Sequence, residues 1–346
     1  MHKALFVRGT TDSTLHVIDV PGDIRLGWTD EFIGAYEAIV ARGPSAPPAR
    51  VTRLDRGWST LLERADGEPF RVRNIGADVA VGDWVVPSAD RERIEHVLPR
   101  VSAFVRRASF EGDRAEAQTI AANIDTVVLV HALTSPPNQR RLERELVLAF
   151  DSGATPAIVL TKDDLVDAAT AAATIDALVA VAAGVPVMVA SGITGTGMRE
   201  LRALVRDDGT MALLGASGVG KSTLVNALVG GEAQRTSAVR EGDQRGRHTT
   251  TAVELIGLPR SPGSSNGWLI DTPGVRAVSL WSSGSGIERA FVDVFDLADR
   301  CRFRDCKHED EPDCAVLAAI EEGRLDARRL DAVKRLVAEE QALEEE

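Results

Sequence analysis

The segment from Gly215 to Thr223 has the residue types and spacing of a phosphate-binding loop. It begins GASGVGKS, which fits the pattern GxxxxGKS, and it lies between an apolar run and a helical pattern. Its glycines let backbone N–H groups turn inward around a β-phosphate, its lysine reaches the β- and γ-phosphate oxygens, and its serine hydroxyl can bind Mg²⁺. The following helix adds the positive end of its dipole. The expected nucleotide contacts are Gly215, Ala216, Ser217, Gly218, Val219, Gly220, Lys221, Ser222 and Thr223.

A second motif, Asp271-Thr-Pro-Gly274, follows the phosphate loop, as a magnesium and γ-phosphate motif should. Asp271 comes after an apolar run and can hold a magnesium-bound water, and the Gly274 N–H can meet the γ-phosphate. The Gly-rich, polar stretch 242–251 lies between the two motifs and has the composition of a mobile loop. Spacing favours Thr249 over Thr250 as the threonine that completes the Mg²⁺ shell, and a β-turn leading into a strand is the alternative for this stretch.

The Thr-Lys-Asp-Asp sequence at 161–164 fits the guanine-selecting pattern TKxD. The Asp164 carboxylate can accept hydrogen bonds from guanine N1–H and N2–H₂, a donor pair that adenine lacks, and the Lys162 stem can cover the base plane. Thr161 stands where Asn is usual, and the sequence does not decide whether Thr161 makes the structural hydrogen bond that an Asn side chain makes in this motif. The pattern alone is weak, but Ser191-Gly192 follows the next apolar run and can offer a backbone N–H to guanine O6. Together the two segments favour guanine over adenine.

The order of these motifs is unusual, because the guanine-selecting motif precedes the phosphate loop. In ordinary GTPases it comes last. The order therefore predicts a circularly permuted GTPase fold, in which the chain leaves the domain directly after the segment that begins at Asp271. We expect that segment to pass nucleotide-driven movement to the domain that follows it.

All three cysteines of the chain lie within fourteen residues, together with one histidine. Three thiolates and one imidazole suffice for a closed tetrahedral Zn²⁺ site, which has no open position for water and is therefore structural. Buried or free cysteines beside a surface histidine are the alternative. The interleaved Arg302, Arg304 and Lys307 would give the site a basic rim suited to a phosphate backbone. The expected zinc ligands are Cys301, Cys306, His308 and Cys314.

Composition indicates soluble globular domains, since 44% of the residues are hydrophobic and 4% are aromatic. The net charge of −12 argues against a uniformly basic nucleic-acid coat, although residues 49–108 carry eleven Arg and nine acidic residues, a net charge of +2.

Clustered rather than scattered cysteines favour a reducing cytoplasm. The N-terminus lacks a signal-peptide pattern, and Asp176 and Gly184-Val-Pro186 break the apolar stretch 168–190. We therefore expect a cytoplasmic protein without a membrane span.

The first third of the chain divides into a leader and a β-rich domain. Residues 1–48 are expected to be a leader and linker with one helix at 30–41, and residues 49–108 a small β-barrel of about five short strands. An RNA-binding OB-fold matches this size, and another small barrel with an Arg-rich surface is the alternative. The strands are expected at 49–54, 59–63, 70–74, 83–87 and 93–99.

Residues 109–283 alternate apolar runs with helical segments, which is typical of a parallel sheet covered on both faces. Each nucleotide motif follows a strand, which is where open α/β sheets bind ligands. Residues 284–346 are expected to be a zinc-binding helical domain with an acidic tail at 344–346. Helices are expected at 138–152, 164–183 and 222–229, and strands at 126–130, 157–160, 185–189, 212–214, 253–256 and 268–270.

These features together resemble the ribosome small-subunit-dependent GTPase A family (RsgA, also called YjeQ) over about residues 49–335. The resemblance implies an α/β protein: an N-terminal OB-fold β-barrel, a circularly permuted P-loop GTPase domain and a C-terminal zinc-binding helical domain. It implies GTP hydrolysis to GDP with Mg²⁺, coupled to late maturation of the 30S ribosomal subunit, stimulated by that subunit and accompanied by 16S rRNA binding. A monomer is expected. The resemblance rests on TKxD at 161–164, GASGVGKST at 215–223, GRHTTT at 246–251, DTPG at 271–274 and the run C-x₄-C-x-H-x₅-C.

Two features depart from the family pattern, and two residues bear on catalysis. Gly192 stands where Ala is usual, and the leader is longer than is common. Val275 follows the Asp271 motif at a position where many GTPases carry a water-orienting Gln, so we expect slow hydrolysis by the isolated protein. His248 is the nearest candidate in the opposing loop, and we hypothesise that the 30S subunit orders residues 242–251 and brings His248 to the attacking water. A solvent-exposed loop histidine is the alternative.

Two other functions fit parts of the sequence. One is a nucleotide-switched RNA-binding assembly scaffold with little intrinsic catalysis. The other is a different permuted ribosome-assembly GTPase, which would lack this order of barrel, GTPase domain and C-terminal zinc domain. Turnover with and without 30S subunits separates these functions.

Overall fold

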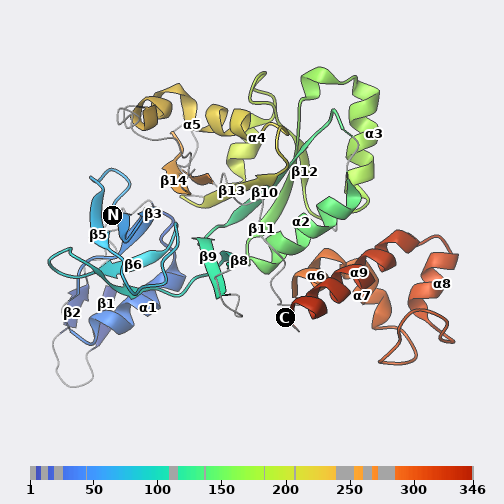
Figure 1. Cartoon of the computed structure of the whole chain (residues 1–346), viewed down its shortest axis with the longest axis horizontal. Coiled ribbons are helices and arrows are strands. Elements are labelled where there is room, and N and C mark those ends of the chain that lie inside the picture. The colour runs from blue at the N-terminus through green and yellow to red at the C-terminus, as the bar shows by residue number, and fades with distance from the viewer. Residues whose placement is uncertain are drawn as a thin grey trace.

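Three packed units follow one another along the chain: a β-barrel, an α/β domain and a group of helices (Figure 1). This is a computed structural model. It describes residues 5–8, 15–18, 26–43, 45–108, 116–135, 138–182, 184–205, 208–238, 253–259, 267–271 and 285–344.

Five short strands form the small β-barrel that the sequence predicts. The strands are β3 (Ala49–Asp55), β4 (Trp58–Leu62), β5 (Phe70–Arg73), β6 (Trp84–Pro87) and β7 (Ile94–Val97). β4 pairs antiparallel with β3 and β5, and β6 pairs antiparallel with β3 and β7. A parallel bridge between Arg73 and Arg93 closes the ring, which gives a five-stranded barrel. Its interior is filled by Ala49, Val51, Leu61, Val72 and Val85.

A helix from the predicted leader packs on this barrel. α1 (Asp30–Val40) buries Phe32 and Tyr36, and the ring of Trp28 lies 4.7 Å from that of Trp84, edge to face. Edge-to-face aromatic contacts stabilise beyond the area that they bury. The helix expected at 30–41 is therefore present and contributes to the barrel's packing. A hairpin of β1 (Leu5–Arg8) and β2 (Leu15–Ile18) precedes it.

The α/β domain is built on a six-stranded sheet in the order β12-β11-β10-β13-β15-β14. All strands are parallel except β14, which is antiparallel to β15. The phosphate-loop strand β13 lies in the centre, although β10, β11 and β12 precede it in the chain, as the permutation predicts. The strands are β10 (Thr126–Ala132), β11 (Thr155–Thr161), β12 (Val187–Val189), β13 (Thr210–Gly215), β14 (Glu254–Gly257) and β15 (Trp268–Asp271).

Helices cover both faces of this sheet, which explains why its strands are almost entirely apolar. Leu129 of β10 shares one hydrophobic cluster with Leu142 of α2, whereas its neighbour Val130 shares another with Leu224 of α5. Successive side chains of a strand therefore pack against helices on opposite faces of the sheet. The helices are α2 (Gln139–Asp151), α3 (Ala168–Val179), α4 (Met198–Ala203) and α5 (Lys221–Ala238).

One predicted helix begins later than the sequence indicated. The helix expected at 164–183 is a short 3₁₀ turn at Asp163–Leu165 followed by α3, which ends at Val179. The reason is the choice of N-cap: the Asp167 side chain accepts a hydrogen bond from the Thr170 N–H at 2.9 Å, which fixes the start of the helix. α5 extends past its predicted end, with a break in helical geometry at Gly230.

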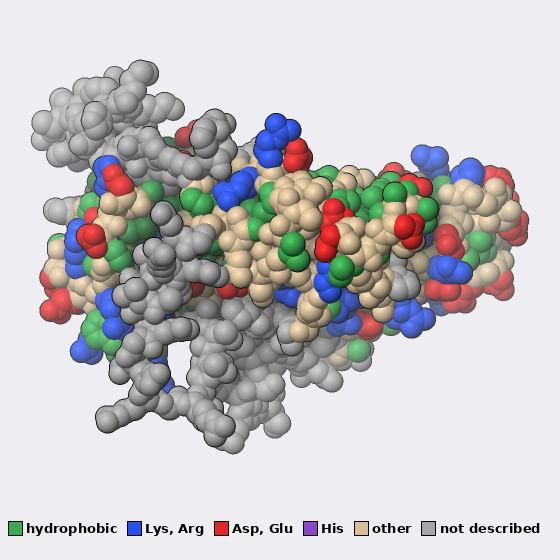
Figure 2. Space-filling model, turned by 90° about the horizontal axis from the view of Figure 1, so that it is seen from above, with side chains coloured by type: hydrophobic (Ala, Val, Ile, Leu, Met, Phe, Trp, Pro, Cys, Tyr) green, Lys and Arg blue, Asp and Glu red, His purple; other side chains and the backbone are tan. Residues whose placement is uncertain are grey.

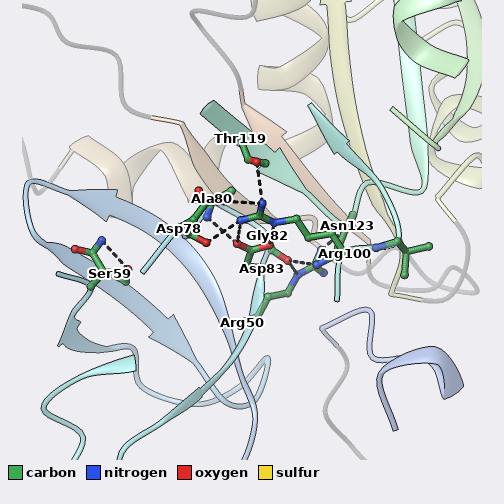
Figure 3. A network of polar contacts seen from close by, with 11 residues as sticks. Arg50, Ser59, Asp78, Ala80, Gly82, Asp83, Arg100, Thr119 and Asn123 are labelled. Carbon is green, nitrogen blue, oxygen red and sulfur yellow. Dashed lines mark hydrogen bonds and ion pairs between the residues drawn. The ribbon is translucent and has the colours of Figure 1, made fainter. Parts of the chain in front are cut away.

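Arg100 joins the barrel to the hairpin of β8 (Ala103–Ala108) and β9 (Glu116–Ala122), which leads into the α/β domain (Figure 3). Its guanidinium donates to both carboxylate oxygens of Asp83 at 2.8 Å and to the Thr119 hydroxyl at 2.8 Å. Asp83 is fully buried; burial raises the pKa of its carboxyl, and the hydrogen bonds from Arg100 oppose that rise. Buried charges need such partners, so this network holds the barrel in one place.

A second buried arginine strengthens the same junction. Arg50 donates to the main-chain carbonyl oxygens of Gly82 at 3.2 Å and Asn123 at 2.9 Å, and also to that of Leu26. Burial lowers the pKa of Arg50 to about 10, so it remains protonated at neutral pH. Gly82 has a φ of 92°, and a Cβ there would collide with the carbonyl oxygen of Ala122. Only glycine permits this close approach.

The barrel and the α/β domain also share backbone pairing. Strand β14 pairs antiparallel with β3 at Glu254 and Arg53. The two sheets therefore form one continuous path of strands across the domain boundary.

The C-terminal helices lie beside α2 (Figure 1). The Gly286 N–H donates to Oδ1 of Asp151 at 2.7 Å, and the buried Arg329 donates to Asp293 at 2.6 Å while lying 3.6 Å from Glu143. These contacts connect α2 with α6, α7 and α9. No helix in the described residues is long and apolar enough to span a bilayer. The helices are α6 (Ser285–Ala290), α7 (Val292–Ala298), α8 (Ala315–Glu321) and α9 (Ala327–Glu344).

Candidate nucleotide-binding site and metal centre

The phosphate loop connects the central strand β13 to helix α5. Gly215, Gly218 and Gly220 have φ values of 149°, 78° and 106°, which favour glycine. A Cβ at Gly215 would collide with the carbonyl oxygen of Val130 on the neighbouring strand. The loop therefore has the backbone geometry that its sequence predicts.

Lys221 and Ser222 lie at the start of α5, where the helix dipole attracts anions. Nζ of Lys221 donates to the carbonyl oxygens of Gly215 at 2.8 Å and Ala216 at 2.5 Å, so the ammonium group lies over the loop. Ser222 and Thr223 are exposed. Farther along α5, Arg202 of α4 donates to the carbonyl oxygen of Leu228 at 2.5 Å. The loop and its helix thus place a lysine and a helix N-terminus where they can bind a phosphate group, and a hydroxyl where it can bind Mg²⁺.

Asp271 ends strand β15, next to β13 in the sheet. Burial raises the pKa of its carboxyl, and the positive charge of Lys221 opposes that rise. A partly buried carboxylate near the phosphate loop suits a cation such as Mg²⁺. The other predicted positions of this region, His248, Thr249, Thr250, Gly274 and Val275, lie outside the described residues.

Thr161 connects the turn at 161–164 to the phosphate loop. Its hydroxyl lies 3.2 Å from the carbonyl oxygen of His131 and within hydrogen-bond reach of that of Val219. The hydroxyl of this side chain, shorter than that of Asn, thus reaches the phosphate loop. Lys162 then adopts the left-handed conformation, with φ 62° and ψ 38°, and the chain turns so that Asp164 is exposed at the carboxyl edge of the sheet.

The loop that follows β12 lies against α5, the helix that begins at the phosphate loop. Oγ of Ser191 accepts from the N–H of Ile193 at 3.3 Å and of Thr194 at 3.2 Å, which forms a tight turn. A Cβ added at Gly192 would lie 2.5 Å from the Thr223 carbonyl oxygen. Glycine, unlike the usual Ala, permits this close backbone contact between the loop at 191–192 and the first turn of α5.

The four predicted metal ligands come together at the C-terminal end of the molecule. Sγ of Cys301 lies 3.8 Å from Sγ of Cys314 and 3.6 Å from Nδ1 of His308, and Nδ1 lies 3.3 Å from Sγ of Cys314. With Cys306, all four ligand atoms are within 4.8 Å of one another. A tetrahedron with metal–sulfur bonds of about 2.3 Å has edges of about 3.8 Å, so this set fits a four-coordinate metal.

Local structure holds these ligands in place. Cys314 caps α8, accepting from the Leu317 N–H, and Nζ of Lys334 on α9 donates to the His308 carbonyl oxygen at 3.2 Å. The Glu311 carboxylate accepts from the N–H groups of Lys307 at 2.7 Å and Glu309 at 2.9 Å. The loop is thus shaped by hydrogen bonds as well as by its ligands.

Comparison with known proteins identifies the family. The RsgA GTPase family model matches residues 97–281. The Small ribosomal subunit biogenesis GTPase RsgA of Streptomyces coelicolor is 42% identical over 332 residues, which cover 92% of this chain and 86% of the relative. This chain belongs to the RsgA GTPase family. The RsgA of Methanosarcina acetivorans is also similar, with 40% identity over 90% of this chain and 84% of the relative.

Two solved structures share the RsgA fold. YjeQ from Thermotoga maritima superimposes with a TM-score of 0.64 over 85% of this chain and 98% of its own length, at 24% identity. YloQ, described as a circularly permuted GTPase, gives a TM-score of 0.61 over 86% and 95%. The predicted fold class, a circularly permuted α/β GTPase with additional domains, is confirmed.

One surface of the β-barrel was not predicted from the sequence. The guanidinium groups of Arg71 and Arg73 lie 5.3 and 5.2 Å from the Trp58 ring centroid, and that of Arg91 lies 4.5 Å from the Phe70 ring. Strand pairing places Trp58 opposite Arg73. The alternation of Arg71 and Arg73 along β5 was the signal in the sequence, but only pairing with β4 shows that both meet one aromatic ring.

Proposed function

We propose that this protein hydrolyses GTP in the biogenesis of the small ribosomal subunit. The observation that carries the proposal is that three segments distant in sequence meet at one edge of the sheet: the turn at 161–164, the loop at 191–192 and the phosphate loop. Membership in the RsgA GTPase family supports hydrolysis rather than a scaffold that only binds nucleotide.

In this proposal the nucleotide lies across the carboxyl ends of β11, β13 and β15. Asp164 selects guanine, with Lys162 over the base and the Gly192 N–H toward O6. The phosphate loop binds the phosphates, with Gly274 at the γ-phosphate. The Mg²⁺ ligands are Ser222, Thr249 and, through water, Asp271.

The metal held by Cys301, Cys306, His308 and Cys314 is proposed to be Zn²⁺. Three thiolates and one imidazole are a donor set that zinc favours over the oxygen-preferring Mg²⁺ and Ca²⁺. The ligands leave no open coordination position, so the ion's contribution is to fold the loop 301–314 and fix it against α9.

We further propose that the protein contacts 16S rRNA through local clusters rather than through a uniformly basic face. On the face shown in Figure 2, Lys and Arg side chains are interspersed with Asp and Glu. The Arg-flanked Trp58 offers a ring for base stacking with cations beside it. Phe303 is 41% exposed beside Arg302 in the metal loop, a similar arrangement.

Such a factor would act as a monomer in the cytoplasm, where small subunits mature. In isolation it would hydrolyse GTP slowly, because Val275 cannot orient water. On the 30S subunit, His248 would be brought to the attacking water.

Steady-state GTP hydrolysis with and without purified 30S subunits tests the proposal. The expected result is slow turnover alone and a large increase at saturating 30S, with no increase from 50S subunits. Equal turnover in all three conditions would refute a role linked to the small subunit. Binding of guanine nucleotide without any hydrolysis would favour the scaffold.

A further inference from the structure

The end of strand β10 holds a buried pair of ionisable side chains that none of the nucleotide motifs contains. Nε2 of His131 lies 2.9 Å from Oε2 of Glu145 on α2, and the two residues are only 9% and 8% exposed. Apart from this contact, neither atom has a hydrogen-bond partner among the described residues. The other oxygen of Glu145 accepts from Nε of Arg141 at 2.8 Å. Each side chain of the pair thus offsets the cost of burying the polar atom of the other.

The backbone of His131 supports the base-selecting turn. Its carbonyl oxygen lies 3.2 Å from Oγ1 of Thr161, and the Leu133 N–H donates to the carbonyl oxygen of Thr161 at 2.9 Å. The end of β10 therefore contacts Thr161 through both its side-chain hydroxyl and its main chain. The same hydroxyl reaches Val219 in the phosphate loop.

We propose that Glu145, acting through His131, is a positioning residue for the base-selecting turn at 161–164. The inference rests on the proposed guanine site. Asn138 caps α2, accepting from the Arg141 N–H at 3.1 Å, so the helix start is fixed and Arg141 can hold the Glu145 carboxylate. That carboxylate fixes the His131 side chain and, with it, the strand end that supports Thr161.

The position of the turn matters because Asp164 lies only three residues beyond Thr161. A carboxylate that accepts from two guanine donors must keep both distances near 2.9 Å and both angles open, and binding groups tolerate displacements of only about 0.5 Å. Phosphate contacts do not depend on this turn to the same degree, because the phosphate loop supplies them from its own backbone.

A comparison of GDP with IDP separates the two kinds of contact. Hypoxanthine lacks the exocyclic amine of guanine, so the ratio of the two dissociation constants reports the Asp164 contact, whereas phosphate contacts are common to both nucleotides. In His131→Ala we expect the Kd for GDP to rise about tenfold and that for IDP by less, so that the ratio falls; about tenfold corresponds to one misaligned charged hydrogen bond. His131→Gln keeps an N–H that can donate to Glu145 and should restore the ratio.

A matched control lies on the same helix. Glu143 is even more deeply buried than Glu145, but its carboxylate faces Arg329 and Arg335 instead of His131. Glu143→Gln should leave the GDP-to-IDP ratio at the wild-type value. If His131→Ala does not fold, Glu145→Gln gives the same comparison, because it keeps the side-chain shape and removes the charge.

Displacement titrations on the full-length protein, without ribosomes, measure these constants. A wild-type ratio in both His131→Ala and Glu145→Gln would overturn the inference, and so would an equal fall in Glu143→Gln. If the wild-type protein itself does not distinguish GDP from IDP, the proposed guanine site fails as well, and that outcome is recognised before any variant is compared.

Discussion

The hydroxyl of Thr161 lies within hydrogen-bond reach of the carbonyl oxygen of Val219, which joins the base-selecting turn to the phosphate loop across 58 residues of sequence. Thr161→Val keeps the shape and removes the donor, which leaves a buried carbonyl group unsatisfied. We expect the Kd for GDP to rise about tenfold, since one unsatisfied buried group costs about 1–3 kcal/mol. Thr161→Asn should restore binding. Thr155→Val, at the exposed start of the same strand, is the control, and an equal loss in both variants would contradict the assignment.

Asp164→Asn should change which nucleotide is preferred. The amide can donate to the 2-oxo group of xanthine, whereas it cannot accept from both guanine donors as the carboxylate does. Competition between GTP and XTP on the purified protein measures the preference. An unchanged preference for GTP would remove Asp164 from the base site.

Cys306→Ala should lower the metal content of the purified protein and destabilise the helical region after residue 285. Binding of the metal and folding of the loop are coupled, so loss of one thiolate weakens both. Binding of GDP should stay within about twofold, because the nucleotide site lies on the other side of α2, and effects of distant sites are usually independent. Asp310→Asn, an exposed residue between the ligands, serves as control, and elemental analysis that finds no zinc in the wild-type protein would refute the identity of the metal.

His248→Ala should lower turnover on saturating 30S subunits by about 10²-fold, the lower range for a group that positions a proton or a water. GTP binding and 30S binding should be nearly unchanged, because neither nucleotide motif is altered. Ser222→Ala, in contrast, should weaken Mg²⁺·GTP binding itself. Single-turnover hydrolysis distinguishes the two, and a wild-type rate in His248→Ala would mean that the activating group comes from elsewhere.

Arg100→Met should destabilise the protein by about 3 kcal/mol at neutral pH, because it leaves the fully buried carboxylate of Asp83 without its charged partner, although the Ala80 N–H still donates to it. Burial already raises the pKa of Asp83, and loss of Arg100 raises it further. A carboxyl group whose pKa is higher in the folded than in the unfolded state gains stability from protonation. The difference from wild type should therefore shrink as the pH falls through that raised pKa.

Urea denaturation between pH 4 and pH 8 measures this dependence for Arg100→Met. Arg93→Met removes a 68% exposed arginine that pairs with Glu95 and should change stability by less than about 1 kcal/mol at any pH. A deficit in Arg100→Met that does not vary with pH would show that the loss comes from packing rather than from the charge of Asp83.

The sequence predicted most of the elements because their signals are local. The strands of the α/β sheet are predominantly apolar, and each begins and ends within two residues of its expected bounds, as with Thr126–Ala132 for the run at 126–130. The later start of α3 was not predictable in the same way. Asp164 and Asp167 are both acceptable N-caps by type, and only the left-handed Lys162, which turns the chain before Asp164, leaves Asp167 to cap the helix.

Other features depend on contacts between distant residues and have no local signal. Nothing near Gly192 in sequence indicates that its α-carbon lies against Thr223, and nothing near His131 indicates a carboxylate on the next helix. The packing of α1 on Trp84 is a third example, since the leader's helical pattern does not specify its partner.

The pairing of β14 with β3 also bears on how the protein could be divided. β14 is the last strand of the nucleotide-binding sheet, and the barrel covers its outer side. If the α/β domain were produced alone from residue 109 onward, the unpaired N–H and C=O groups of that strand would face solvent and could pair with another molecule. The separated α/β domain should therefore tend to self-associate through this strand.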